Sequence, residues 1–270
     1  MISVNGLILF SILRNIAINI TIICYTTIFI LLLTVLNMEQ IQGKSENYTV
    51  MKIVPGSFHQ GDPKFHESAG LQCGINCIVS TCFSVAKKIS SWNQSDLDYI
   101  LETGNEYFKN NGYTQYLALD ELPIVVDIDG YVFNLSKMED MKTIDMNIAT
   151  DSRLFWGSAF SDCLKISQAV ICVTCDVIFM IRKESNYYYV FDSHSRSSNN
   201  GEPCDNGYSV LMKFKNLNEL TNYVKYIYLV KREKESVPLQ MQFYNCELNE
   251  SDKIEFNKSL QQNQKKNTTK

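Results

Sequence analysis

The first 37 residues are far more hydrophobic than the rest of the 270-residue chain. Residues 16–36 are mostly Ile, Leu, Val, Phe and Thr, and no charged side chain occurs from Asn15 to Asn37. About 20 such residues can cross a bilayer as a helix. A cleaved signal peptide would have a shorter apolar stretch and small residues at its cleavage site. We therefore expect a single-pass membrane anchor in residues 1–37, followed by a polar linker over residues 38–49.

Beyond the linker, the apolar positions first follow a helical period. They recur every three or four residues, which places one apolar face on a helix; these residues are Ile75, Ile78, Val79, Cys82, Val85, Ala86 and Ile89. A second such helix follows Trp92 and ends before Gly112, and residues 151–167 predict a third.

The chain also contains short runs rich in β-branched and aromatic residues, most of them in its second half. They predict strands over residues 50–54, 124–126, 169–175, 177–182, 187–191 and 208–214, whereas residues 217–228 fit either a helix or a strand. This mixture predicts an α+β domain over residues 50–230, in which helices pack on a mostly antiparallel sheet. After Val230 the chain becomes rich in Lys, Glu, Gln, Asn and Ser, which predicts disorder over residues 231–270.

Composition excludes some classes of function. The net charge is −4 and the basic residues form no dense block, so nucleic acid is not expected as a partner. The nine cysteines are odd in number and lie mostly in apolar runs, which favours a reducing compartment. Cys172 and Cys175 have the spacing of zinc ligands but lack a second ligand pair, so a buried strand is favoured over a structural zinc site.

Two short stretches carry the chemistry of a nucleophilic site. Cys73 stands where the apolar helix begins, and the partial positive charge of a helix N-terminus stabilises a thiolate. Asp192 and His194 follow a predicted strand two residues apart, so their side chains share a side of an extended segment. A carboxylate so placed can orient the imidazole, whose other nitrogen then faces a thiol. Each stretch alone also fits a structural role, a buried capping cysteine or a polar turn.

A cysteine nucleophile also requires hydrogen-bond donors for the oxyanion that forms during attack. The backbone N–H of Cys73 is one candidate donor. Gln60 and Gln72 are candidate side-chain donors; Gln72 adjoins the cysteine and is expected to point away, whereas Gln60 lies on a preceding loop that can fold back.

Taken together, these segments resemble the herpesvirus-type tegument ubiquitin-specific proteases, which are papain-like cysteine deubiquitinases. The resemblance extends from about Ile53 to about Val230 and is carried by Gln60, Gly70-Leu71-Gln72-Cys73 with Asn76 and Cys77, Trp92, Leu97-Asp98, Leu101, Gly104, Tyr107, Glu121-Leu122-Pro123, Tyr189-Val190-Phe191-Asp192-Ser193-His194-Ser195-Arg196, Gly201 and Gly207.

The resemblance implies a papain-like fold and cleavage of ubiquitin from proteins or ubiquitin chains without a metal or cofactor. It assigns the nucleophile to Cys73, the base to His194, the acid to Asp192 and the oxyanion glutamine to Gln60. A catalytically silent, membrane-tethered module that binds ubiquitin or another protein is the alternative.

The expected location follows from the anchor and the thiols. We expect a membrane-anchored protein with a cytosolic catalytic domain, or a soluble cytosolic protein if translation starts at Met38 or Met51.

Overall fold

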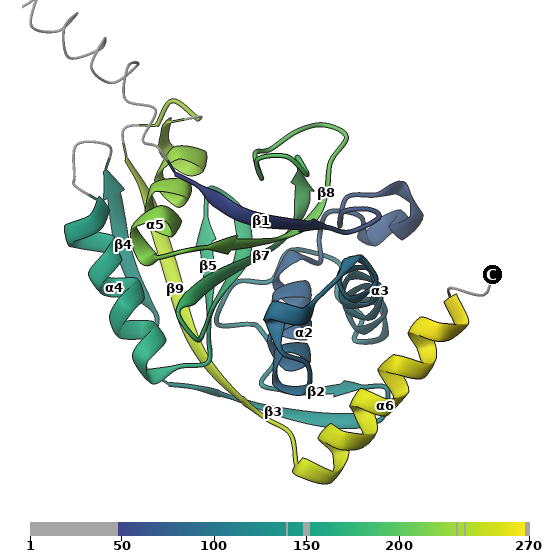
Figure 1. Cartoon of the computed structure of the whole chain (residues 1–270). Coiled ribbons are helices and arrows are strands. Elements are labelled where there is room, and N and C mark those ends of the chain that lie inside the picture. Colours follow the sequence, from purple (N-terminus) through teal and green to yellow (C-terminus); the bar gives the residue numbers. More distant parts are fainter. Residues whose placement is uncertain (1–47, 139, 148–151, 231, 235, 268–270) are drawn as a thin grey trace, which may run out of the picture. The chain divides into compact units, whose positions relative to one another are not determined.

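The computed structural model describes residues 48–138, 140–147, 152–230, 232–234 and 236–267, all within a compact unit of residues 48–270 (Figure 1). The hydrophobic segment 16–36 and most of the expected linker lie outside the described residues. Within the described ranges, no helix has both the length and the hydrophobicity to span a membrane. Membrane anchoring therefore stays a prediction from the sequence.

The described strands form one sheet in which every pairing is antiparallel (Figure 1). They are β1 (Val50–Pro55), β2 (Val125–Ile128), β3 (Tyr131–Lys137), β4 (Lys142–Asn147), β5 (Ala169–Thr174), β6 (Val177–Glu184), β7 (Tyr187–Arg196), β8 (Tyr208–Phe214) and β9 (Ser236–Glu247). Their order is β1-β8-β7-β6-β5-β9-β3-β2, and β4 also pairs with β9. The strands predicted over residues 50–54, 124–126, 169–175, 177–182, 187–191 and 208–214 are confirmed to within a few residues.

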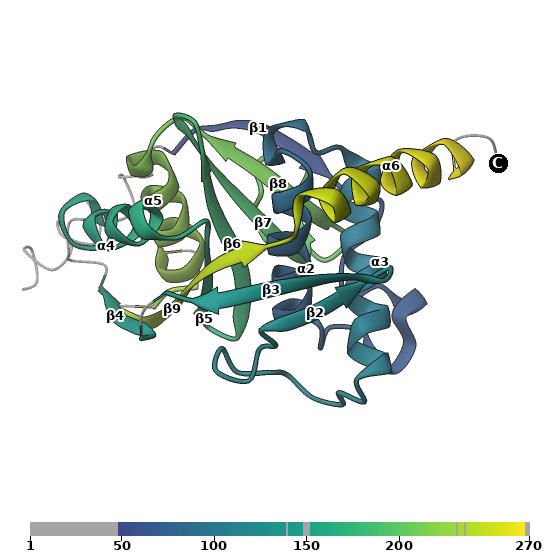
Figure 2. The same ribbon diagram turned by 90° about the horizontal axis from the view of Figure 1, so that it is seen from below.

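Helices cover both faces of this sheet (Figure 2). They are α2 (Cys73–Ala86), α3 (Gln94–Asn110), α4 (Ser152–Ile166), α5 (Leu217–Lys225) and α6 (Glu250–Asn267), with short turns η1 (Pro63–Ser68), η2 (Ile89–Ser91) and η3 (Tyr226–Val230). Side chains of α2, α3 and α6 belong to one hydrophobic core, and side chains of α4 and α5 belong to a second.

Strand β6 shows why the central strands are apolar on both faces. Ile178 and Met180 belong to the core that contains α2, whereas Phe179 and Ile181 belong to the core that contains α4 and α5. All four side chains are at most 5% exposed. Because successive side chains of a strand point to opposite faces, a strand between two helical layers needs an almost continuous apolar sequence.

The disorder expected over residues 231–270 is wrong for β9 and α6. Strand β9 lies in the interior of the sheet, between β5 on one side and β3 and β4 on the other. Its side chains at Val237, Leu239, Met241 and Phe243 are buried, and they are separated by Pro238, Gln240 and Gln242. Averaging the composition over the whole tail concealed this period of two.

The C-terminal helix α6 also packs on the domain through a narrow apolar stripe. Phe256 and Leu260 are buried in the core that contains α2, while most described neighbours on the helix are exposed or partly exposed. The Asn257 side chain donates a hydrogen bond to the Ala86 carbonyl at the end of α2 (2.8 Å). Over residues 250–260, the polar side chains therefore lie mainly on the solvated part of a helix rather than in a disordered tail.

Helix α2 is held tightly against α3. At the N-terminus of α3, Asn93 and Asp96 form a capping box, and Lys87 binds Asp96 with nitrogen–oxygen distances of 2.7 and 2.8 Å. Farther along α3, the side chain of Asn76 occupies the space where a Cβ of Gly104 would lie. The glycine therefore allows the two helices to approach closely, and this contact fixes the helix that begins at Cys73.

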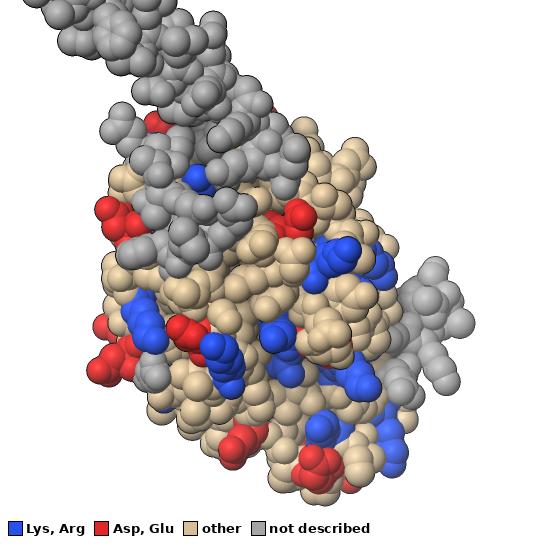
Figure 3. Space-filling model, turned by 60° about the vertical axis from the view of Figure 1, so that its left-hand side comes forward, with Lys and Arg blue, Asp and Glu red and all other residues tan. Residues whose placement is uncertain are grey.

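The surface carries charges of both signs. On the face shown in Figure 3, Lys and Arg side chains are interspersed with Asp and Glu side chains. This face therefore lacks the continuous positive surface that would bind a phosphate backbone.

Candidate functional site

The nucleophile predicted from the sequence stands at the start of the most buried helix. Cys73 is the first residue of α2 and is only 1% exposed. Gln72 precedes it without forming a side-chain capping bond, and Gly70 makes the preceding turn with a φ of 85°. The first N–H groups of a helix lack intrahelical partners. The thiol therefore lies in the positive field of the helix N-terminus, and the Gln72 side chain does not cap the free N–H groups there.

Asp192 and His194 form the predicted carboxylate–imidazole pair on β7. Asp192 Oδ1 lies 2.7 Å from His194 Nδ1, and the same oxygen accepts the backbone N–H of His194 at 2.9 Å. The carboxylate is 1% exposed, whereas the imidazole remains partly exposed. A hydrogen on Nδ1 leaves Nε2 free to face another group. The Cys73 thiol is close enough to this imidazole to raise its pKa.

The surroundings favour the charged forms of His194 and Asp192. Burial by itself would lower the pKa of His194, but the Asp192 carboxylate and the Cys73 thiol together raise it to about 9. Burial would likewise raise the pKa of Asp192, but Arg196 and His194 hold it well below its usual range. At neutral pH the site therefore presents an imidazolium beside the thiol and an ionised carboxylate behind the imidazolium.

Arg196 is a member of this cluster to which sequence analysis assigned no role. It is 1% exposed, and its Nε and Nη2 lie 2.7 and 2.6 Å from Asp192 Oδ2. Nη2 also donates to the hydroxyl of Tyr228 (3.0 Å), whose ring stacks on Phe179. The two carboxylate oxygens of Asp192 are thus divided between His194 and Arg196. The spacing of these residues, each two positions apart on an extended strand, was the available signal.

Gln60 lies against β7, which shows that the loop carrying it folds back toward this strand. The residue is 3% exposed, and its backbone N–H donates to the Ser193 carbonyl at 2.8 Å. Its backbone carbonyl accepts the N–H of Gly70 at 2.9 Å, which ties the loop to the turn that precedes α2. Gln72 is fully buried, and its amide has no hydrogen-bond partner within the described part of the chain.

The other two histidines occupy different surroundings. His59 is partly exposed, and its Nδ1 accepts the backbone N–H of Gly61 at 3.1 Å. Burial and the nearby charge of His194 lower the pKa of His59, so it is neutral at physiological pH. His66 is exposed on η1. The structure therefore brings His194, rather than His59 or His66, to the Cys73 thiol.

The remaining cysteines are separated from this chemistry. Cys77 lies one turn beyond Cys73 and is fully buried, which raises the pKa of its thiol well above the usual value. Cys172 is buried in β5 as expected, but Cys175 lies in the turn after β5, where its φ is 49°. Among the residues that the structure describes, no group of three or more His, Cys, Asp or Glu side chains is placed to hold a metal ion.

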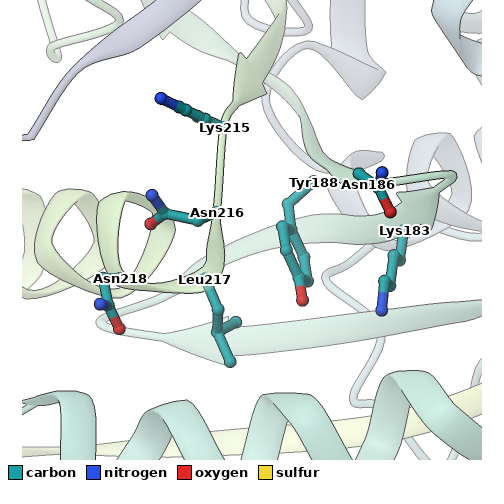
Figure 4. A pocket seen from close by; sticks show the side chains of 7 residues that line it. All are labelled: Lys183, Asn186, Tyr188, Lys215, Asn216, Leu217 and Asn218. Carbon is teal, nitrogen blue, oxygen red and sulfur yellow. The ribbon is translucent and has the colours of Figure 1, made fainter.

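A surface pocket of about 370 Å³ lies elsewhere on the domain (Figure 4). It is formed by the turn between β6 and β7, by β7 and by the start of α5; the lining residues are Lys183, Asn186, Tyr188, Lys215, Asn216, Leu217 and Asn218. None of the predicted site residues contributes to it, so this pocket is distinct from the cysteine site.

Comparison with known proteins places this geometry in context. A family model described as the N-terminal conserved region of herpesvirus tegument proteins matches residues 55–244. The fold is similar to that of the ubiquitin-specific protease encoded by murine cytomegalovirus tegument protein M48, crystallised in complex with a ubiquitin-based suicide substrate. The match has 15% sequence identity and a TM-score of 0.57, and it covers 74% of this chain and 88% of the other. The sequence matches no curated protein significantly. The expected α+β, papain-like fold is therefore confirmed.

Proposed function

Because the chain belongs to the family defined by the N-terminal conserved region of herpesvirus tegument proteins, we propose that it is a thiol-dependent deubiquitinase. It would hydrolyse the peptide or isopeptide bond at the C-terminus of ubiquitin. The observation that carries the proposal is the 2.7 Å contact between Asp192 and His194, with the Cys73 thiol in reach of the same imidazole. The ubiquitin-based substrate bound by the M48 protease supports ubiquitin as the substrate class.

The proposed reaction begins with a thiolate–imidazolium pair. The Cys73 thiolate attacks the carbonyl carbon of the last ubiquitin residue, and the carbonyl electron pair moves onto oxygen. The Cys73 N–H and the Gln60 side-chain amide donate hydrogen bonds to this oxyanion. His194 then gives its proton to the leaving amine as the carbon–nitrogen bond breaks, which leaves a thioester on Cys73.

Hydrolysis of the thioester completes the cycle. The now neutral His194 takes a proton from water, and the resulting hydroxide attacks the thioester carbonyl. The same two donors stabilise the second oxyanion. Its collapse releases the Cys73 thiolate and the ubiquitin carboxylic acid, which loses its proton to the solvent. Asp192 remains ionised throughout and stabilises the imidazolium whenever it forms.

A ubiquitin probe with a C-terminal electrophile tests this proposal directly. The folded wild-type protein should be labelled at Cys73, and Cys73→Ala should abolish labelling. Cys204 is an exposed free thiol on the loop after β7, so Cys204→Ala is a matched control that should be labelled like the wild type. Absence of labelling of folded wild-type protein would contradict the proposal.

The second candidate function is a silent module that binds ubiquitin without cleaving it. The hydrophobic segment 16–36, with the tethering it predicts, is the observation that favours this candidate. Hydrolysis of a fluorogenic ubiquitin substrate by the wild type, together with its loss in His194→Ala, would exclude a silent module. Binding of ubiquitin without any turnover would favour it.

A further inference from the structure

We propose that Ser193, which separates the acid and the base of the site, is a positioning residue that orients the Gln60 amide toward the oxyanion. The inference rests on the proposed function, because it concerns how the same site stabilises charge during attack on a carbonyl. Ser193 would not touch the substrate and would act only through Gln60.

The contacts between these two residues carry the inference. The Ser193 hydroxyl donates to Gln60 Oε1 at 2.8 Å, and the Ser193 carbonyl accepts the Gln60 backbone N–H at 2.8 Å. Ser193 is fully buried and Gln60 is 3% exposed. The strand that carries Asp192 and His194 therefore also holds the glutamine, through both the backbone and the side chain of one residue.

These contacts also assign the two ends of the Gln60 amide. Nε2 lies 3.4 Å from the Gly70 carbonyl oxygen, which can only accept a hydrogen bond. Rotating the amide by half a turn would place Oε1 against that oxygen, and two acceptors would face each other. The Gly70 carbonyl therefore decides the orientation, and the Ser193 hydroxyl, which can donate or accept, is compatible with it as a donor to Oε1.

This orientation matters because only Nε2 can stabilise an oxyanion. The amide nitrogen carries two hydrogens, and the long contact to Gly70 accounts for one of them. The second hydrogen is available to the oxygen that becomes negative during attack. Without the Ser193 hydroxyl, the 3.4 Å contact alone would hold the amide, and a neutral donor that is poorly oriented loses much of its effect in the transition state.

Two small reagents separate this role from a structural one. p-Nitrophenyl acetate acylates a thiolate through an oxyanion: sulfur attacks the acetyl carbon, and collapse of the intermediate expels p-nitrophenolate and leaves a thioester. Iodoacetamide alkylates a thiolate by displacing iodide, and no oxyanion forms. Neither reagent contains ubiquitin. Peptide mass mapping would measure both reactions at Cys73 itself, apart from the exposed Cys204.

Ser193→Ala should slow acylation of Cys73 about five- to tenfold, the range expected for one neutral hydrogen bond, and leave alkylation unchanged. Gln60→Ala should slow acylation about 100-fold, as for other lost oxyanion donors. Adding Ser193→Ala to Gln60→Ala should then have no further effect on the acylation rate. Ser193→Thr retains the hydroxyl and should restore acylation, provided that its thermal unfolding matches that of the wild type.

Three outcomes would overturn the inference. They are equal slowing of both reactions by Ser193→Ala, a further loss when Ser193→Ala is added to Gln60→Ala, and acylation of the wild type no faster than that of Gln60→Ala. If the ester acylates the wild type rapidly but the protein cleaves no ubiquitin substrate, only the proposed function is refuted. The ratio of the acylation rate to the alkylation rate would still decide the role of Ser193.

Discussion

Replacing Asp192 by Asn tests the electrostatic account of the site most directly. Burial lowers the pKa of His194, but the Asp192 carboxylate, with a smaller effect from the Cys73 thiol, raises it from an ordinary value near 6.5 to about 9. At about 1.4 kcal/mol per pH unit, this difference favours the imidazolium by about 3 kcal/mol. In Asp192→Asn burial, the largest single effect, remains and should outweigh the remaining effect of the Cys73 thiol, so the pKa of His194 should fall below 6.5. At pH 7.5 the imidazolium would then decrease from nearly all molecules to about a tenth or fewer.

The rate at which iodoacetamide alkylates Cys73 reports this change, because the imidazolium stabilises the thiolate. Measured by mass mapping from pH 5 to 10, the wild type should react steadily across neutral pH and change only as His194 loses its proton near pH 9. Asp192→Asn should react at least about ten times more slowly at pH 7.5. Asp162→Asn is the matched control, since Asp162 pairs with Lys165 on the surface, where an ion pair contributes little.

Folding must be separated from chemistry in this experiment. Asp192→Asn leaves Arg196 buried without its carboxylate partner, which costs about 3–5 kcal/mol when a buried pair is broken. The double variant Asp192→Asn with Arg196→Met removes both members and should recover much of the stability. If a folded variant without Asp192 is alkylated at neutral pH as fast as the wild type, the carboxylate does not maintain the imidazolium and the reasoning is refuted.

Four further outcomes are expected. The free energy of unfolding should fall as pH rises from 6.5 to about 9, because the raised pKa of His194 stabilises the folded state only while the imidazole is protonated; His194→Gln should lack this fall in urea titrations. Arg196→Lys should lower kcat for a ubiquitin substrate by about tenfold with KM unchanged, because lysine cannot contact Asp192 through two nitrogens as arginine does. An equal loss of kcat in Arg196→Ala and Arg196→Lys would show that the positive charge at this position contributes nothing to catalysis. Gly104→Ala should destabilise the protein by roughly 1–3 kcal/mol through overpacking against α2, whereas Glu102→Ala on the exposed side of α3 should not. Met241→Asp should prevent folding, as judged by circular dichroism, because β9 is buried between other strands.

Sequence patterns predicted most of the fold where a single period dominates a segment. The helix from Cys73 and the strands around Asp192 follow simple periods of 3.6 and 2. Strand β9 was not predicted, because the alternation of apolar residues such as Leu239 and Phe243 with other residues is confined to a short part of a mostly polar segment. Pairing with β5, β3 and β4 supplies its stability, and no local pattern reports such partners.

The site was only partly accessible to the same reasoning. Chemical type and spacing selected Cys73, Asp192 and His194. The structure pairs Asp192 with His194 at 2.7 Å, and the Cys73 thiol is near enough to raise the pKa of His194, whereas the catalytic role of the three residues stays a proposal. The contacts of Ser193 and Arg196 depend on the bulge in the pairing of β7 with β8 between residues 192 and 196 and on the packing of Tyr228 behind the sheet. Both features belong to the tertiary structure. Residue type alone therefore identified Ser193 and Arg196 only as members of a family motif and assigned them no role.

The position of β9 has a consequence for biosynthesis. Three strands pair with β9, which follows all of them in the chain, so one hydrogen-bonding edge each of β5, β3 and β4 stays open while the earlier residues leave the ribosome. The sheet that supports the nucleophile helix closes only once residue 247 has emerged. A ribosome-bound nascent chain that stops short of β9 should therefore contain every reactive group and yet remain inert.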